Sequence, residues 1–118
     1  MLQDKDVSGS LIRRSDLPIV GIVAVDVQIG GETVPSIIYC ANEKLTAWLN
    51  VCPHQGRRLD YAPGKFLVDR GQLVCAAHGA SFRLEDGECV SGPCRGSSLH
   101  EVPVRVTQDG ELIFGPLG

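Results

Sequence analysis

The sequence predicts an all-β protein, and three observations favour this fold class. No long window of the chain shows the helical periodicity of apolar residues. Short runs rich in β-branched and other apolar residues alternate with turn residues instead. Several of these runs are joined by dipeptides typical of tight hairpins. Because the chain has 118 residues, we expect one domain over residues 1–118.

The first half of the chain predicts four strands connected by short turns. The expected strands are Leu11–Arg14, Gly21–Ile29, Ser36–Cys40 and Leu45–Val51. Gly30-Gly31 predicts a hairpin turn between the second and third of them, and Asn42-Glu43 predicts a turn between the third and fourth.

A loop-rich insert follows at about residues 51–98, and the chain then returns to strands. Within the insert, short strands are expected at Gln72–Cys75 and Ser81–Leu84. Near the end, valines alternate with other residues at Val102, Val104 and Val106, as in a strand with one buried face. Asp109-Gly110 predicts a hairpin turn into a strand at Leu112–Phe114.

Charge and composition exclude several classes of partner. The net charge is -3, aromatic residues make up 5% of the chain and no basic run occurs, so we expect no nucleic-acid partner. Residues 52–98 hold six basic and five acidic residues, whereas the remainder holds five basic and nine acidic ones. Met1–Ser10 has no apolar stretch that would suit a signal peptide or a membrane anchor. We therefore expect a cytoplasmic protein, in which five cysteines are more often metal ligands or buried thiols than disulfides.

Four residues of the insert have the spacing of a metal site. The sequence reads Cys52-Pro53-His54, then 20 residues, then Cys75-Ala76-Ala77-His78. Each short segment offers one thiolate and one imidazole. Zinc accepts two cysteines and two histidines, but its usual structural sites pair like residues within each segment. A Rieske [2Fe–2S] centre takes two cysteines on one iron and two histidines on the other, and mixed segments supply this donor set.

From Cys52 to Leu99 the sequence resembles the Rieske family. The segments that carry the resemblance are CPHQGRRL, CAAHGASF and GECVSGPCRGSSL. In length the chain is similar to bacterial Rieske ferredoxins and other stand-alone Rieske proteins. The resemblance implies an antiparallel β-sandwich base, a small loop-rich cluster-binding subdomain, and a third loop at Gly92-Pro93 that covers the cluster.

The resemblance also implies a role for each ligand. Cys52 and Cys75 are expected to bind the buried iron, and His54 and His78 the outer iron near the surface. Two ferric ions, two sulfides and two thiolates sum formally to zero charge, so an electron is added more easily than to a cluster with four thiolates.

Within the Rieske range, the sequence favours a low reduction potential. High-potential relatives have an extra cysteine on each ligand loop, and here Gly56 and Ala77 stand in those places. Ala80 and Phe82 stand where hydroxyl donors to sulfur are expected. Fewer donors stabilise the reduced form less, so we expect a potential nearer about -150 mV than +300 mV.

These features predict a one-electron carrier rather than an enzyme. We expect redox protein partners, namely a reductase and a terminal oxygenase or similar acceptor. A complete Rieske oxygenase would need two more histidines and a carboxylate for a mononuclear iron, but the chain has three histidines in all. A structural or regulatory zinc module is the third alternative.

The remaining candidate residues have simpler interpretations. Cys40 ends an apolar strand and is expected to be a buried thiol. Cys89 and Cys94 are expected to be packed thiols beside the cluster, with a redox disulfide left open; a four-cysteine cluster would leave both histidines unused. His100 is expected at the surface and Trp48 in the core. Arg57 and Arg58 form either a solvated turn or a patch that docks an acidic partner.

Overall fold

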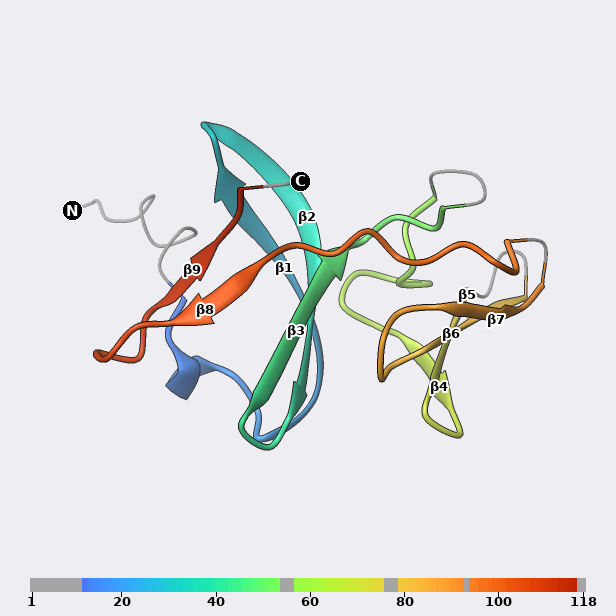
Figure 1. Cartoon of the computed structure of the whole chain (residues 1–118), viewed down its shortest axis with the longest axis horizontal. Coiled ribbons are helices and arrows are strands. Elements are labelled where there is room, and N and C mark those ends of the chain that lie inside the picture. The colour runs from blue at the N-terminus through green and yellow to red at the C-terminus, as the bar shows by residue number, and fades with distance from the viewer. Residues whose placement is uncertain (1–11, 54–56, 76–78, 93, 117–118) are drawn as a thin grey trace.

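The computed structural model describes residues 12–53, 57–75, 79–92 and 94–116. Over these residues the protein is nearly all β, with every strand pair antiparallel, as the sequence predicts. The elements are η1 (Arg14–Asp16), β1 (Val20–Ile29), β2 (Glu32–Ala41), β3 (Lys44–Leu49), β4 (Leu67–Asp69), β5 (Gln72–Cys75), β6 (Ala80–Arg83), β7 (Cys89–Ser91), β8 (Val104–Val106) and β9 (Leu112–Phe114). They form two lobes, with β1–β3, β8 and β9 in one and β4–β7 in the other (Figure 1).

The sheet of β1, β2 and β3 is a meander whose two turns are those expected from the sequence. Ile29 pairs with Glu32, so Gly30-Gly31 is a two-residue hairpin, and both glycines have positive φ (61° and 85°). Ala41 pairs with Lys44 across the second turn, where Asn42 has φ 61°. Asparagine tolerates this left-handed conformation better than most residues, which is why it suits this turn.

The central strands β2 and β3 are buried on both faces. Ile37 pairs with Trp48, and both belong to the core that continues into the β4–β7 lobe. Ile38 pairs with Ala47, and both belong to a second core shared with the C-terminal strands β8 and β9. Since successive side chains of a strand point to opposite faces, two adjacent residue pairs serve two cores. This second core closes the antiparallel β-sandwich base.

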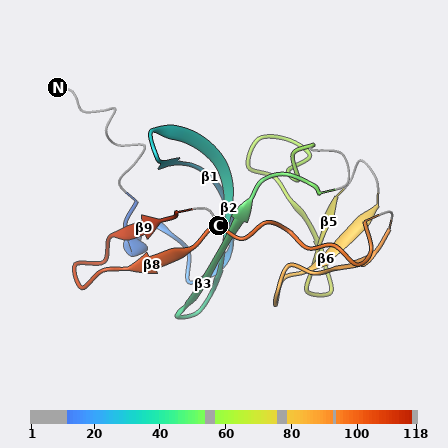
Figure 2. The ribbon, with the colours of Figure 1, turned by 45° about the horizontal axis from the view of Figure 1, so that its top comes forward.

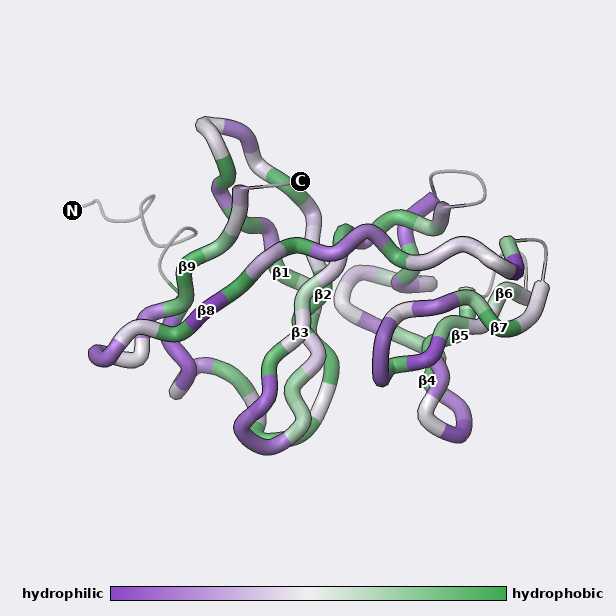
Figure 3. Tube along the Cα trace, viewed as in Figure 1, coloured by the Kyte–Doolittle hydropathy of each residue, from purple (hydrophilic) through white to green (hydrophobic). Residues whose placement is uncertain are grey.

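The second lobe is a four-stranded sheet in the order β4-β5-β6-β7. Figure 2 shows that it stays separate from the β1–β3 sheet after a 45° turn. β5 and β6 confirm the two strands expected here, whereas β4 and β7 were missed by the sequence analysis. Each has three residues, and β4 is exposed along its whole length, so neither carries a clear apolar alternation. In Figure 3, hydrophobic stretches lie along strands of both lobes, and hydrophilic stretches lie at several of the turns.

The strand expected at Leu11–Arg14 is wrong over its described residues. Arg13 makes only an isolated bridge with Glu111, and Arg14 already begins η1. The Asp16 carboxylate accepts a hydrogen bond from the Arg13 N–H at 3.0 Å, which favours a local turn over a strand. Leu11 lies outside the described residues. At the other end, Val102 is buried but precedes β8.

The segment that leaves β3 is anchored by two polar side chains. Asn50 is fully buried, and its Oδ1 accepts a hydrogen bond from the Leu59 N–H at 2.8 Å. Asp60 accepts two hydrogen bonds from Arg58, at 2.9 and 3.0 Å, and one from the Gly64 N–H at 3.0 Å. These contacts hold residues 57–64 against the end of the central sheet.

Gly92 provides a test of close packing in the second lobe. A Cβ at Gly92 would lie 2.6 Å from the Ala80 Cα, whereas a Cβ at Gly96 would meet nothing within 4 Å. Both glycines have nearly the same positive φ, 96° and 97°. Gly96→Ala should cost about 1–2 kcal/mol for the left-handed conformation. Gly92→Ala should cost about 1–3 kcal/mol more because the backbones must separate. Urea unfolding monitored by Trp48 fluorescence measures the free energy of unfolding of both variants. Equal losses of stability in the two variants would contradict the close approach of Gly92 to Ala80.

Asp60 should make stability depend on pH in the acid range. The Arg58 hydrogen bonds, and then the Gly64 N–H, hold the pKa of Asp60 below its usual value of 3.8, against the opposing effect of burial. A lowered folded-state pKa stabilises the protein fully above the unfolded-state pKa, and this contribution is lost as pH falls through the folded-state pKa. Asp60→Asn should therefore cost about 1–3 kcal/mol at pH 7. The difference in free energy of unfolding between the variant and the wild type should shrink below about pH 4. A difference that stays constant with pH would exclude this role of the Asp60 carboxylate.

Candidate metal centre

Two of the four predicted ligands stand at the start of short closed loops. Cys52 follows β3, and its N–H donates a hydrogen bond to the Arg57 carbonyl at 2.6 Å. Cys75 ends β5, and its carbonyl accepts a hydrogen bond from the Gly79 N–H at 2.8 Å. Each loop is thus closed at its base by a backbone hydrogen bond. His54 and His78 belong to these loops by sequence and lie outside the described residues.

Both cysteines are buried in one apolar cluster. Cys52 is 0% exposed and Cys75 is 1% exposed, and the same buried cluster contains Ala80 and Phe82. Cys75 pairs with Ala80 across β5 and β6, so the start of the second loop is fixed by a sheet. Neither Ala80 nor Phe82 brings a hydroxyl group to this core.

Cys89 and Cys94 complete a group of sulfurs in this core. Neither forms a disulfide in this structure, and their Sγ atoms lie 3.0 Å apart. The Cys89 thiol also donates to the Ser91 carbonyl at 3.2 Å. Burial, followed by the neighbouring Cys89 and Cys52, raises the pKa of Cys94 to about 12. The interpretation of packed thiols is therefore confirmed for this structure.

The donor set fits a Rieske cluster. Two buried thiols emerge from an apolar core, and each is followed at short range in the sequence by an imidazole. This arrangement suits one iron on the core side and a second iron toward the ligand loops. Within the described residues alone, no group of three or more His, Cys, Asp and Glu side chains is placed to hold a metal ion. The donor set predicted from the sequence also includes His54 and His78, which lie outside the described residues.

The two arginines beside the first ligand loop differ in their contacts. Arg58 is bound by both carboxylate oxygens of the buried Asp60, whose side chain is 1% exposed. Arg57 is exposed and makes no ion pair with a described residue. Arg57 therefore remains a candidate for docking an acidic partner. Arg58 has a structural role that the sequence analysis missed. The sequence signal that could have predicted this role is the carboxylate of Asp60 two residues after Arg58.

Three other sequence interpretations are confirmed. Cys40 is fully buried, and burial raises the pKa of its thiol while the nearby Arg14 opposes the shift. His100 is exposed, and its carbonyl accepts a hydrogen bond from the Leu49 N–H at 2.8 Å. Trp48 is 1% exposed and stacks on Tyr39 with ring centroids 6.4 Å apart.

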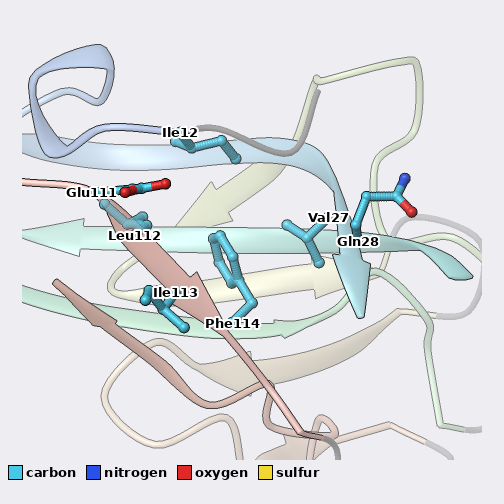
Figure 4. A pocket seen from close by; sticks show the side chains of 7 residues that line it. All are labelled: Ile12, Val27, Gln28, Glu111, Leu112, Ile113 and Phe114. Carbon is cyan, nitrogen blue, oxygen red and sulfur yellow. The ribbon is translucent and has the colours of Figure 1, made fainter. Parts of the chain in front are cut away.

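A surface pocket lies in the other lobe. It is formed between the end of β1 and β9, with Val27, Gln28 and Phe114 among its lining residues (Figure 4). Neither Cys52 nor Cys75, the two predicted ligands that the structure describes, lines it. Among the described residues, no helix has the length and apolar character needed to cross a membrane.

Comparisons with known proteins agree with this fold and site. Residues 10–108 match the family model of the Rieske [2Fe–2S] domain. The ferredoxin of carbazole 1,9a-dioxygenase from Nocardioides aromaticivorans IC177 is 22% identical, with a TM-score of 0.64 and coverage of 91% of this chain and 98% of that one. A chain in a complex of reduced oxygenase and oxidized ferredoxin of carbazole 1,9a-dioxygenase is 22% identical, with a TM-score of 0.68 and coverage of 92% and 94%.

A third similar solved structure is described as a subunit of a reductase. The putative NADH-dependent nitrite reductase small subunit from Mycobacterium tuberculosis is 22% identical, with a TM-score of 0.64 and coverage of 92% of this chain and 95% of that one. No match was found among curated proteins. The family model spans most of the chain, and it agrees with the closed ligand loops and their buried cysteines: the chain belongs to the Rieske [2Fe–2S] domain family, and its cofactor is a [2Fe–2S] cluster.

Proposed function

We propose that this protein is a one-electron carrier that holds its cluster on Cys52, His54, Cys75 and His78. The observation that carries the proposal is the pair of loops, each of which begins at a buried cysteine and is closed by a backbone hydrogen bond. When bound, the cluster accepts and returns one electron. The protein residues hold it in place and set how easily that electron is added.

The chain gives each pair of ligands a different environment. Cys52 and Cys75 lie in the buried core, so their sulfurs are shielded from water. His54 and His78 are the ligands that we assign to the outer iron, from which an electron has a short path to a partner.

We further propose that the physiological partners are a reductase and a terminal oxygenase. The similarity to a ferredoxin of a dioxygenase system supports an oxygenase as the acceptor. The similarity to a putative nitrite reductase small subunit supports an alternative acceptor, a larger reductase. In both cases the chain supplies electrons and performs no substrate chemistry itself. Stopped-flow oxidation of the reduced protein by each class of acceptor distinguishes the two, and substrate turnover without any partner would contradict both.

The ligand assignment predicts which substitutions remove the cluster. The purified protein should be reddish brown, with two iron and two sulfide per chain. Cys52→Ala, His54→Ala, Cys75→Ala and His78→Ala should each abolish or severely damage the visible spectrum, because each removes one bond to iron. Iron and acid-labile sulfide analysis with visible absorption measures the loss.

Matched controls come from one of the cysteines outside the donor set and from the remaining histidine. Cys40→Ala and His100→Ala should retain iron, sulfide and the visible spectrum, since Cys40 lies in the other core and His100 is exposed. A colourless wild-type protein with stoichiometric zinc and no sulfide would overturn the assignment. So would a full spectrum in His54→Ala or His78→Ala.

Arg57 should contribute to docking an acidic partner. It follows the first ligand loop and is exposed, so Arg57→Glu should slow electron transfer at low ionic strength without changing the cluster spectrum. The deficit should shrink as salt is added, because the Debye length falls to about 8 Å at physiological ionic strength. Stopped-flow rates across a salt series measure this effect.

Arg105→Glu is the matched control for docking. Arg105 is an exposed arginine on β8 in the other lobe, so the same charge change there should alter the rates much less. Arg58→Glu is unsuitable because it would place a second carboxylate against the buried Asp60. Equal slowing by the substitutions at positions 57 and 105 would indicate a general charge effect instead of docking at the ligand loops.

A further inference from the structure

Two thiols that the proposed function does not use face each other in the cluster lobe. The Sγ atoms of Cys89 and Cys94 lie 3.0 Å apart, and both side chains are buried. Because a disulfide bond is about 2.05 Å long, these sulfurs are about 1 Å from bonding distance. Cys40, the third cysteine outside the predicted donor set, belongs to the other core. Cys89 and Cys94 are therefore the pair that can be cross-linked without a ligand.

Backbone hydrogen bonds hold the two cysteines in this position. The Cys89 N–H donates to the Ser97 carbonyl at 2.8 Å, and the Cys89 carbonyl accepts from the Gly96 N–H at 3.4 Å. The Ser97 N–H donates to the Cys94 carbonyl at 2.9 Å. Both cysteines are thus bound to the same short segment. A disulfide forms without strain only where the backbone already places the two side chains together, and here it does.

The pair is open to a small oxidant. Cys94 is 6% exposed, and Gly92 and Arg95 on either side of it are exposed. The thiolate is the form of a cysteine that an oxidant attacks. The raised pKa of Cys94 therefore makes the oxidation slow at neutral pH, and the two thiols are the resting state.

We propose that Cys89 and Cys94 are a site of reversible oxidation, at which hydrogen peroxide forms a disulfide across the third loop. The O–O bond of peroxide breaks, one thiol becomes a sulfenic acid, and one water leaves. The second thiol then displaces the hydroxyl group as a second water, and the S–S bond forms. The two thiols lose two electrons and two hydrogens, and the peroxide is reduced to two waters. A dithiol reverses the step by thiol–disulfide exchange.

The disulfide restrains the loop that packs against the sheet of a predicted ligand. Gly92 lies between the two cysteines in the sequence, and a Cβ there would stand 2.6 Å from the Ala80 Cα. Ala80 is the strand partner of Cys75. We therefore expect the oxidised protein to release iron to a chelator more slowly than the reduced protein does. This consequence rests on Cys75 being a ligand, as in the proposed function, whereas formation of the disulfide does not.

The test exposes the cluster-loaded protein to a small excess of hydrogen peroxide and analyses it by mass spectrometry without reduction. The wild type should lose two titratable thiols and the mass of two hydrogens, and its peptide map should join Cys89 to Cys94. Dithiothreitol should restore both thiols. Cys40→Ala is the matched control and should form the same disulfide. Cys94→Ala should form no disulfide and should gain oxygen on Cys89 instead, because a sulfenic acid without a second thiol is oxidised further.

The same samples show whether the disulfide restrains the third loop. Iron release to a chelator is measured before and after oxidation, and visible absorption records how much cluster remains. Cys94→Ala treated in the same way corrects for any direct effect of peroxide on the cluster. Oxidation should slow iron release in the wild type and in Cys40→Ala, but not in Cys94→Ala. Equal or faster release from the oxidised wild type would overturn the restraint.

Results on the wild type alone decide the inference if Cys94→Ala does not fold. Retention of both thiols, or addition of oxygen without a disulfide, would overturn it. A disulfide that joins Cys89 or Cys94 to Cys52 would overturn it as well. Failure of the proposed function is recognised separately, because the purified protein would then lack two iron and two sulfide, whereas the disulfide is detected by mass whether or not iron is bound.

Discussion

The pleat of β2 and β3 is the constraint that connects the two halves of the molecule. Ile37 and Trp48 face the core that continues into the β4–β7 lobe. The adjacent pair, Ile38 and Ala47, faces the core of the β-sandwich base. Because side chains alternate along a strand, a shift of one residue in register would exchange the two faces. One short antiparallel ladder therefore positions both cores. The chain leaves that ladder only three residues before Cys52, so the first ligand loop begins from a rigid base.

Polar groups that follow the first ligand loop are bound by local contacts, although the buried Nδ2 of Asn50 has no hydrogen-bond partner among the described residues. The Asn50 side-chain carbonyl holds the Leu59 N–H, and the Asp60 carboxylate holds Arg58 and Gly64. Buried polar groups cost free energy unless they find partners, and here the partners are the backbone and side chains that follow the first loop. The same contacts that compensate for burial also determine where that loop ends. They also assign different roles to two neighbouring arginines: Arg58 fixes the chain, and Arg57 remains available at the surface.

The surroundings of the cluster sulfurs combine an apolar core with few hydrogen-bond donors. Ala80 and Phe82 fill space beside the cysteines without adding a hydroxyl, which favours a lower potential. The reduction potential of this protein therefore depends in part on residues that do not bind iron. Gly92 contributes by allowing the third loop to approach the backbone of Ala80.

The sequence by itself predicted the strands and turns that depend on short patterns of neighbouring residues. Turn dipeptides such as Gly30-Gly31 and the apolar run around Ile37 predicted the meander, since both depend only on the conformational preferences of neighbouring residues. The spacing of Cys52, His54, Cys75 and His78 predicted the cofactor that the family model shows, because two short segments contain the donor types that a Rieske cluster takes. The tertiary structure alone decided the pairing of the three-residue strands β4 and β7, the attachment of Arg58 to Asp60, and the approach of Gly92 to Ala80. These contacts join segments whose own sequences lack a distinctive pattern, so only packing against the rest of the fold selects them.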